Sequence, residues 1–258
     1  MSYLKALTVV IVCCVLLLPL WQSYAKAMQR GDTFTGQSWW GTRRDSAGMA
    51  PDAVKFRQTA IVQIYAAPAY GWRGRVAVHP WIIFKKAGET QYSRYEVTRW
   101  GDENVIRLNR SIPDGYWYGA RPSLLADHRG AAAEAMIPRI EAAIKSYPYP
   151  QTYRAWPGPN SNTFIAHIGR EVPALKLDMP ANAIGKDYRA LTRPIGLPPS
   201  GKGVQVSLLG VLGFTLGAEE GIEVNVLGIN VGVDLTSPAL RLPFIGRFGY
   251  DDAPKNES

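Results

Sequence analysis

The sequence predicts an α+β domain in which an antiparallel sheet carries helices packed on one side, followed by a Gly-rich β extension. Three observations support this class. Residues 58–100 contain three β-rich segments separated by Gly- or Pro-containing connections. Residues 131–147 and about 160–172 have the apolar spacing of helices. Residues 193–258 are rich in Gly, Val, Ile and Leu, with apolar residues at alternate positions.

The N-terminal segment 6–21 is apolar and contains no charged residue. Lys5 precedes it, and a small-residue pattern at 23–25 follows, which is typical of an export signal. Residues 1–25 are therefore expected to be either a cleaved signal peptide or a retained membrane anchor. Both alternatives place the body in the cell envelope, as a periplasmic or inner-membrane-anchored protein. Residues 26–57 are polar and predict a linker or docked segment ahead of a core domain at 58–192.

The composition excludes several function classes. A hydrophobic fraction of 47% excludes a disordered chain. The only two cysteines, Cys13 and Cys14, lie in the apolar segment, so the body holds no disulfide, Cys-ligated zinc or cysteine nucleophile. With three histidines in the whole chain, we expect no metal and no cofactor.

The net charge of +8 falls only to +7 when residues 1–25 are removed, because they contain one charged residue, Lys5. A basic envelope protein would be attracted to anionic lipid or acidic polymers. No run of Lys or Arg exceeds two residues, and export separates the protein from nucleic acid. Nucleic-acid binding is therefore not expected.

The three β-rich segments at 59–67, 75–86 and 91–100 predict an antiparallel meander. The second is apolar on both faces, with His79 beside Trp81 on one of them, so it should lie inside a sheet covered on both sides. In the C-terminal block the apolar residues change from even to odd positions. For one apolar face to stay buried, a turn or bulge must lie near 227–228.

One segment, 156–166, carries a candidate chemical group. Ser161 lies at the start of the second predicted helix, where unpaired N–H groups suit a developing oxyanion. Helical spacing places Ser161 on the apolar side of that helix and His167 off it. His79 could meet Ser161 across a helix-on-sheet packing and act as its base. Alternatively, Asn160 or Ser161 serves only as the helix N-cap, and His79 is a hydrogen-bonded core residue.

A third catalytic residue depends on strand register. Glu96 is the chemically better group to orient an imidazole, whereas Tyr95 is the geometrically safer choice, and a one-residue shift decides between them. We assign Ser161, His79 and Glu96 as candidate catalytic residues. Asn160, Asn162 and Trp81 are the candidate substrate contacts.

Several stretches, among them GWRGRVAVHPWIIFKKAG, YEVTRWG and WPGPNSNTFIAHIGREVP, resemble the bacterial "domain of unknown function 3750" family. The resemblance implies a bacterial, membrane-associated or exported protein of unassigned activity. More remotely, a His-bearing strand and a later helix opening with Asn-Ser-x-x-Phe are similar to the circularly permuted papain-like proteins, of which lecithin retinol acyltransferase is one. That family has Asn-Cys-x-x-Phe, with the cysteine as nucleophile. The resemblance implies a permuted papain-like core in which Ser161 replaces the cysteine and His79 is the base.

Two functional hypotheses follow. In the first, the protein is a serine-variant hydrolase or acyltransferase that acts on an amide or ester in the envelope. In the second, it is a non-catalytic envelope module that binds a peptide, glycan or lipid. The aromatic residues that would then supply the contact surface are Trp81, Trp100, Trp117 and Trp156.

Overall fold

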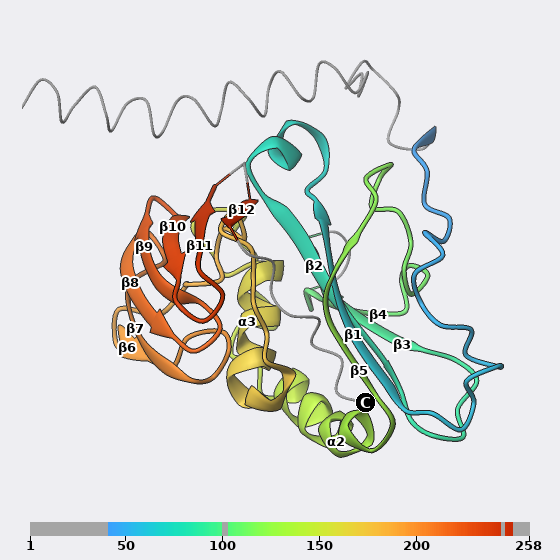
Figure 1. Cartoon of the computed structure of the whole chain (residues 1–258). Coiled ribbons are helices and arrows are strands. Elements are labelled where there is room, and N and C mark those ends of the chain that lie inside the picture. The colour runs from blue at the N-terminus through green and yellow to red at the C-terminus, as the bar shows by residue number, and fades with distance from the viewer. Residues whose placement is uncertain (1–40, 100–102, 244–245, 250–258) are drawn as a thin grey trace, which may run out of the picture.

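The computed structural model describes residues 41–99, 103–243 and 246–249, in two antiparallel sheets with two α-helices (Figure 1). The first sheet contains β1 (Ile61–Pro68), β2 (Val78–Lys85), β3 (Ser93–Val97), β4 (Ile106–Leu108) and β5 (Ser123–Arg129). The helices are α2 (Gly130–Lys145) and α3 (Ser161–Glu171), and short 3-10 turns lie at η2 (Gly71–Arg75) and η3 (Pro173–Leu175). The second sheet contains β6 (Ile195–Gly196), β7 (Gly203–Leu208), β8 (Leu212–Gly217), β9 (Gly221–Val226), β10 (Ile229–Asp234), β11 (Ala239–Leu242) and β12 (Gly246–Gly249). The α+β class and the strand-rich C-terminal extension are confirmed.

The first sheet has the strand order β4-β3-β2-β1-β5. The predicted three-strand meander is present as β1, β2 and β3, and β4 extends it at one edge. At the other edge β5 pairs with β1 and then leads through Gly130, at a φ of 65°, directly into α2. This connection returns the chain across the sheet, so that both helices cover the same face (Figure 1).

Both faces of β2 are buried, as predicted. On one face Ile82 and Phe84 pack with Val62 and Ile64 of β1 against the apolar sides of α2 and α3. On the other face Trp81 joins a smaller cluster whose members are Tyr65, Ala67, Trp81, Ile83 and Trp117. The residues that cover this second face come from the loops before β1 and after β4.

The described part of the segment before β1 is docked on the sheet by two buried polar groups. Asp114 accepts hydrogen bonds from the Ser46 hydroxyl at 2.8 Å and from the Met49 N–H at 2.6 Å. The Lys85 ammonium, fully buried, donates to the carbonyls of Phe56 and Thr59, each at 2.7 Å. These contacts satisfy backbone groups that would otherwise be buried without partners.

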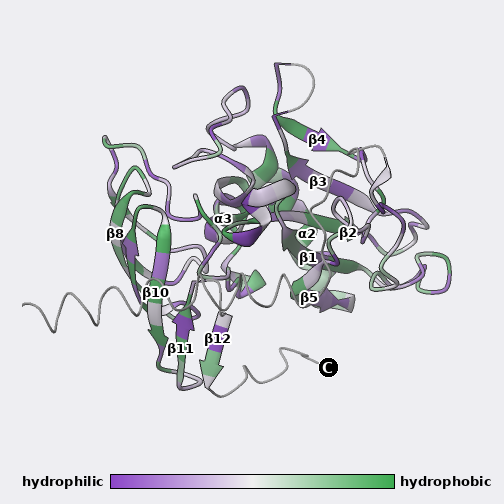
Figure 2. Cartoon of the chain, turned by 90° about the horizontal axis from the view of Figure 1, so that it is seen from above, coloured by the Kyte–Doolittle hydropathy of each residue, from purple (hydrophilic) through white to green (hydrophobic). Residues whose placement is uncertain are grey.

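Both predicted helices are present. The residues whose spacing predicts α2, namely Met136, Ile137, Ile140 and Ile144, are all buried, and Pro138 lies inside the helix. Helix α3 lies between the two sheets (Figures 1 and 2). Its Gly169 allows this close approach, because a Cβ there would lie 2.2 Å from the Pro199 carbonyl oxygen. No helix among residues 41–99, 103–243 and 246–249 is long and apolar enough to cross a bilayer; the apolar segment 6–21 lies outside these ranges.

The second sheet confirms one expectation and corrects another. The predicted turn is the β9–β10 hairpin, with Leu227 at a φ of 55° and Gly228 at 84°. The expectation that the apolar residues are the buried set is wrong. Along β7 the burial pattern is inverted: Val204, Val206 and Leu208 are exposed, while Gln205 and Ser207 are buried. Strands β8, β9 and β10 continue the inversion, and hydrophobic residues colour much of β8 in Figure 2.

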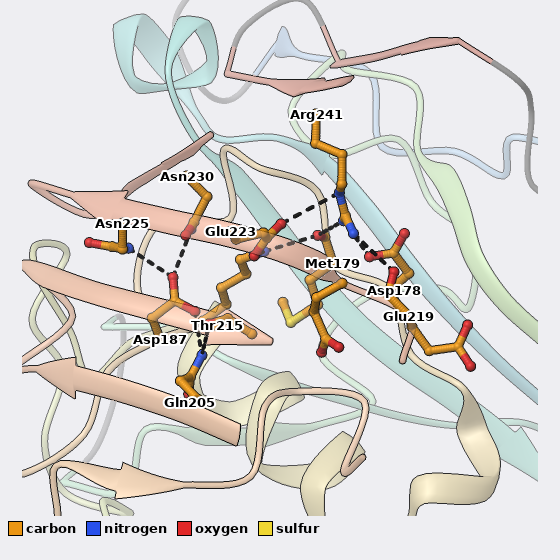
Figure 3. A network of polar contacts seen from close by, with 12 residues as sticks. Asp178, Met179, Asp187, Gln205, Thr215, Glu219, Glu223, Asn225, Asn230 and Arg241 are labelled. Atoms are coloured by element: carbon orange, nitrogen blue, oxygen red, sulfur yellow. Dashed lines mark hydrogen bonds and ion pairs between the residues drawn. The ribbon is translucent and has the colours of Figure 1, made fainter. Parts of the chain in front are cut away.

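The inversion has a clear physical cause, which is a charged segment packed against the inner face (Figure 3). Asp187 accepts hydrogen bonds from the side-chain amides of Gln205, Asn225 and Asn230, at 2.6, 2.8 and 2.7 Å. Nearby, Lys186 forms an ion pair of 2.7 Å with Glu223. Because buried charges need polar partners, the polar side of the sheet must face inward.

Candidate functional site

A cavity of about 240 Å³ lies where the start of α3 meets the beginning of β2, the turn after β1 and the end of β3. Four of the sequence-predicted site residues line it: His79, Asn160, Ser161 and Asn162. Two arginines, Arg73 and Arg99, also contribute to its wall, and no Asp or Glu is among the lining residues.

Asn160 determines where α3 begins. Its Oδ1 accepts hydrogen bonds from the N–H groups of Asn162 at 2.9 Å and Thr163 at 3.2 Å, while the Thr163 hydroxyl accepts from the Asn160 N–H at 3.0 Å. This is a reciprocal capping box. The Asn160 amide also donates to the carbonyls of Ala155 and Ile184. The N-cap is therefore Asn160, which leaves Ser161 without a capping role.

Ser161 is the first residue of α3 and is only 3% exposed. The N–H groups of the next three residues all have acceptors on Asn160. Among the described residues, the Ser161 N–H has no acceptor, and the Ser161 hydroxyl has no hydrogen-bond partner. A single unpaired N–H beside a hydroxyl, at the positive end of a helix, is suited to binding an oxyanion.

Asn162 connects the helix start to the sheet. Its side-chain amide donates to the carbonyl of Val78 at 3.1 Å and to that of Ile184 at 2.9 Å. Val78 directly precedes His79, so this bond fixes the helix start beside the candidate base. The Oδ1 of Asn162 is buried without a hydrogen-bond partner in the described residues.

His79 forms the most specific polar contact of the site. Its Nε2 lies 2.9 Å from Oε2 of Glu96, and both residues are buried, at 5% and 2% exposed. Arg94 donates to the same carboxylate oxygen at 3.1 Å and to the Ile112 carbonyl at 2.6 Å. The register choice is thus resolved in favour of Glu96, whereas Tyr95 faces the other way and stacks on Phe84.

The buried environment sets the protonation of this pair. Burial lowers the pKa of His79, and the hydrogen bond and charge of Glu96 oppose the shift without reversing it. Burial alone would raise the pKa of Glu96, but the hydrogen bond from His79 and the charge of Arg94 outweigh it, so this pKa is lowered. At neutral pH the imidazole is therefore neutral and the carboxylate ionised.

The side chain of His79 lies on the face of the sheet opposite the helices. Its ring stacks on Trp117 with centroids 3.8 Å apart, whereas Val78 packs with the helix-side core. His79 and Ser161 therefore do not meet through the helix-on-sheet core that the sequence predicts. Both residues instead line the cavity at the end of the sheet.

Other predicted residues lie elsewhere. Trp81 is fully buried, donates to the Pro113 carbonyl and does not line the cavity, so it is a core residue. Trp156 is 53% exposed, and Trp100 is outside the described residues, whereas Trp117, at 7% exposed, lines the cavity beside His79. His167 lies away from Ser161, as its helical position predicts, in contact with the Ala143 carbonyl and the Ser146 hydroxyl.

Three arginines are missing from the sequence-based site: Arg94, Arg73 and Arg99. Arg94 is two residues before Glu96, and the period of a strand could have placed both on one face. Arg73 and Arg99 reach the cavity from a turn and a strand end, where only the tertiary structure brings them together.

The family assignment rests on a match over half of the chain. The family model described as "Protein of unknown function (DUF3750)" matches residues 59–188, which contain the first sheet, both helices, the cavity and Asp187. Neither a comparison with curated proteins nor one with solved structures finds a match. The matched region ends before the second sheet begins at β6. The chain therefore belongs to the DUF3750 family.

Proposed function

We propose that this protein is a serine-dependent hydrolase or acyltransferase of the cell envelope, acting on an amide or ester. One observation carries the proposal. His79 and the helix-initial Ser161 line one cavity, and the buried Glu96 is hydrogen-bonded to His79 beside it. In the proposed roles Ser161 is the nucleophile, His79 the general base and Glu96 a positioning residue.

The proposed reaction uses the remaining nitrogen of His79. Nε2 is engaged by Glu96, so Nδ1 would accept the Ser161 hydroxyl proton as Oγ attacks the substrate carbonyl carbon. The resulting oxyanion would be stabilised by the unpaired Ser161 N–H. Collapse would break the bond to the leaving group, which takes the proton from His79. Water or an acceptor alcohol or amine would then release the acyl group from Ser161 by the same steps.

Serine requires a stronger base than cysteine does, because its hydroxyl has a much higher pKa than a thiol. The ionised, buried Glu96 supports such a base, since its charge stabilises the imidazolium formed during the reaction. Arg94 keeps that carboxylate ionised and fixed.

The charge of the cavity supports a substrate that carries an anionic group near the scissile bond. Arg73 and Arg99 line the wall, and both act to lower the pKa of Tyr153, which also lines it; burial nevertheless raises that pKa overall. Both arginines therefore contribute positive charge to the same cavity. A carboxylate or phosphate is the ligand chemistry that paired guanidinium groups recognise.

We place the protein in the envelope, at the inner membrane or in the periplasm, from the apolar segment 6–21 and the cysteine-free body. The same segment is the proposed membrane contact if it is retained as an anchor. Sequencing of the mature N-terminus tests this placement: a start at Lys26 identifies a cleaved signal, and an intact Met1 identifies an anchor.

Labelling with a fluorophosphonate probe tests the reaction. The wild-type protein should label, and Ser161→Ala should abolish the labelling while its circular dichroism stays unchanged. Ser146→Ala is the matched control, because Ser146 also contacts a histidine, His167, but lies away from the cavity. Labelling that survives in Ser161→Ala, or a folded wild-type protein that does not label, would contradict the proposal.

A binding module is the second candidate, and exposed aromatic residues near the cavity favour it. Trp72, at 67% exposed, and Trp156, at 53%, are each next in sequence to a lining residue. Such side chains suit the face of a sugar ring or a peptide. In this case the wild-type protein and Ser161→Ala should bind envelope material equally well. Trp72→Ala and Trp156→Ala should weaken the binding.

A further inference from the structure

The outer face of the second sheet is apolar and exposed. Alternate residues on three adjacent central strands point outward: Val204 and Val206 on β7, Phe214 and Leu216 on β8, and Val224 and Val226 on β9. Their exposed fractions lie between 38% and 53%. A continuous apolar surface that extends over three strands of a folded protein indicates a contact site.

This face carries no charge at its centre. The only charged residues of strands β7–β10 are Glu223 and Asp234, and both are buried on the inner side. These four strands also contain no Trp, Tyr, Lys or Arg. Surfaces that contact lipid typically combine apolar side chains with Trp, Tyr and basic residues. A face of Val, Leu, Ile and Phe instead matches the inner face of two packed sheets.

The size of the face is sufficient for self-association. Strands of six residues at about 3.3 Å per residue are about 20 Å long, and seven strands about 4.8 Å apart span roughly 30 Å. With the shorter outer strands counted at their own lengths, two such faces of seven strands together cover about 1,100 Å². This area is close to the lower end of specific protein–protein interfaces.

We propose that the outer face of the second sheet, centred on β7–β10, is the contact surface for a second copy of this chain. The two sheets would pack face to face about a two-fold axis, because the same face on each copy can then bury itself. No residue that lines the cavity comes from β6–β12, so the dimer would leave both cavities open. The inference does not depend on the proposed catalytic role.

Cysteine cross-linking tests the contact, since Cys13 and Cys14 are the only cysteines of the chain. In the full chain with both changed to Ser, we would introduce Val206→Cys, Phe214→Cys and Val224→Cys one at a time. After mild oxidation in membranes of the expressing cells, at least one variant should give a disulfide-linked dimer on a non-reducing gel. Val54→Cys, at a residue 69% exposed and outside the sheet, is the matched control and should stay monomeric.

Three results are distinguishable. A cross-link at the face, without one at the control, supports the dimer. Face cysteines that neither cross-link nor react with a membrane-impermeant maleimide would show that lipid or another part of the chain covers the face. Face cysteines that react fully with the maleimide would show a free surface. Either of the last two results overturns the proposal.

A charged substitution gives an independent measurement. Val224→Glu places a carboxylate at the centre of the face without touching the inner network. In mass photometry of the detergent-purified full chain, it should raise the dimer dissociation constant at least tenfold, with unchanged circular dichroism. A well-folded Val224→Glu protein that dimerises like the wild type would overturn the proposal.

Discussion

The Glu96 carboxylate lies 2.9 Å from Nε2 of His79, with both groups shielded from water. The two residues come from neighbouring antiparallel strands and share the face that also carries Trp81. Arg94 supplies the positive charge that makes a buried carboxylate tolerable. The arrangement fixes one nitrogen of the imidazole and leaves the other for a second partner.

Glu96→Gln should lower the pKa of His79 further, because the variant loses the carboxylate whose charge opposes the effect of burial. NMR titration of the His79 imidazole, assigned with His79→Asn, measures this directly. Glu141→Gln, on the outer side of α2, is the control and should leave the titration unchanged. An unchanged or raised pKa in Glu96→Gln would show that the carboxylate does not act on this ring.

The protein should lose stability as the pH falls below about 6.5, the ordinary pKa of histidine. His79 has a lowered pKa in the folded state, so the unfolded chain binds its proton first, and stability present above that pH is lost on acidification. The lowered pKa of Glu96 acts in the same direction below about 4.5. Each proton taken up only by the unfolded chain contributes up to about 1.4 kcal/mol per pH unit to the slope of the unfolding free energy against pH.

Urea unfolding at pH 7, 6 and 5 measures this slope. His79→Gln should reduce it, and His167→Gln should reduce it separately, since burial also lowers the pKa of His167. If His79→Gln has the same pH dependence as the wild type, the imidazole is not held neutral in the folded state.

Asn160→Ala should destabilise the protein by about 1–3 kcal/mol, because it removes the helix cap and two further hydrogen bonds to the Ala155 and Ile184 carbonyls. Urea unfolding measures the loss. Asn160→Asp separates the two contributions, since it retains the capping oxygen and removes only the amide donors. Asp52→Ala, which removes a comparable side-chain contact to N–H groups in an exposed turn, should cost less. If Asn160→Ala and Asp52→Ala lower the free energy of unfolding equally, the α3 cap is no more important to stability than an exposed turn.

Asp187→Ala should detach the second sheet before the first one unfolds. It leaves the buried amides of Asn225 and Asn230 without their acceptor and that of Gln205 with Thr215 alone, at a cost of about 3 kcal/mol or more. Hydrogen exchange should accelerate in β7–β10 and stay slow in β1 and β2. Asp127→Asn, on a partly exposed pair with Arg129, is the control and should change neither region. Uniform acceleration over both sheets would show that they unfold as one unit.

The sequence predicts those parts of this fold whose periodicity agrees with their burial. Strands β1 to β3 and both helices bury the residues that their spacing selects. The three-residue strand β4 is too short to have a period, and β5 carries an exposed leucine, Leu124, and charged residues on a sheet edge. Asn160 and Ser161 are recognisable from local chemistry. The Glu96 contact needed the register of β3 on β2, which no single strand encodes.

The second sheet shows why an alternating hydropathy pattern alone does not predict which face of a sheet is buried. An alternating strand indicates two different faces, but the element that packs on the sheet decides which face is inside. Here that element contains Lys186 and Asp187, 37 and 38 residues before the groups they bind on β9. Hydropathy cannot identify this pairing, because both partners are polar.

The inward polar face of β7–β10 also determines which substitutions the extension tolerates. Replacing Thr215 by Val, which keeps the size of the side chain, or Ser207 by Ala would bury an apolar group among polar partners and impair folding. Replacing outward leucines by Ser would alter self-association and leave the monomer fold intact. In a saturation mutagenesis experiment, the positions intolerant of apolar residues would therefore map the interior of this sheet, and the positions tolerant of polar ones would map its surface.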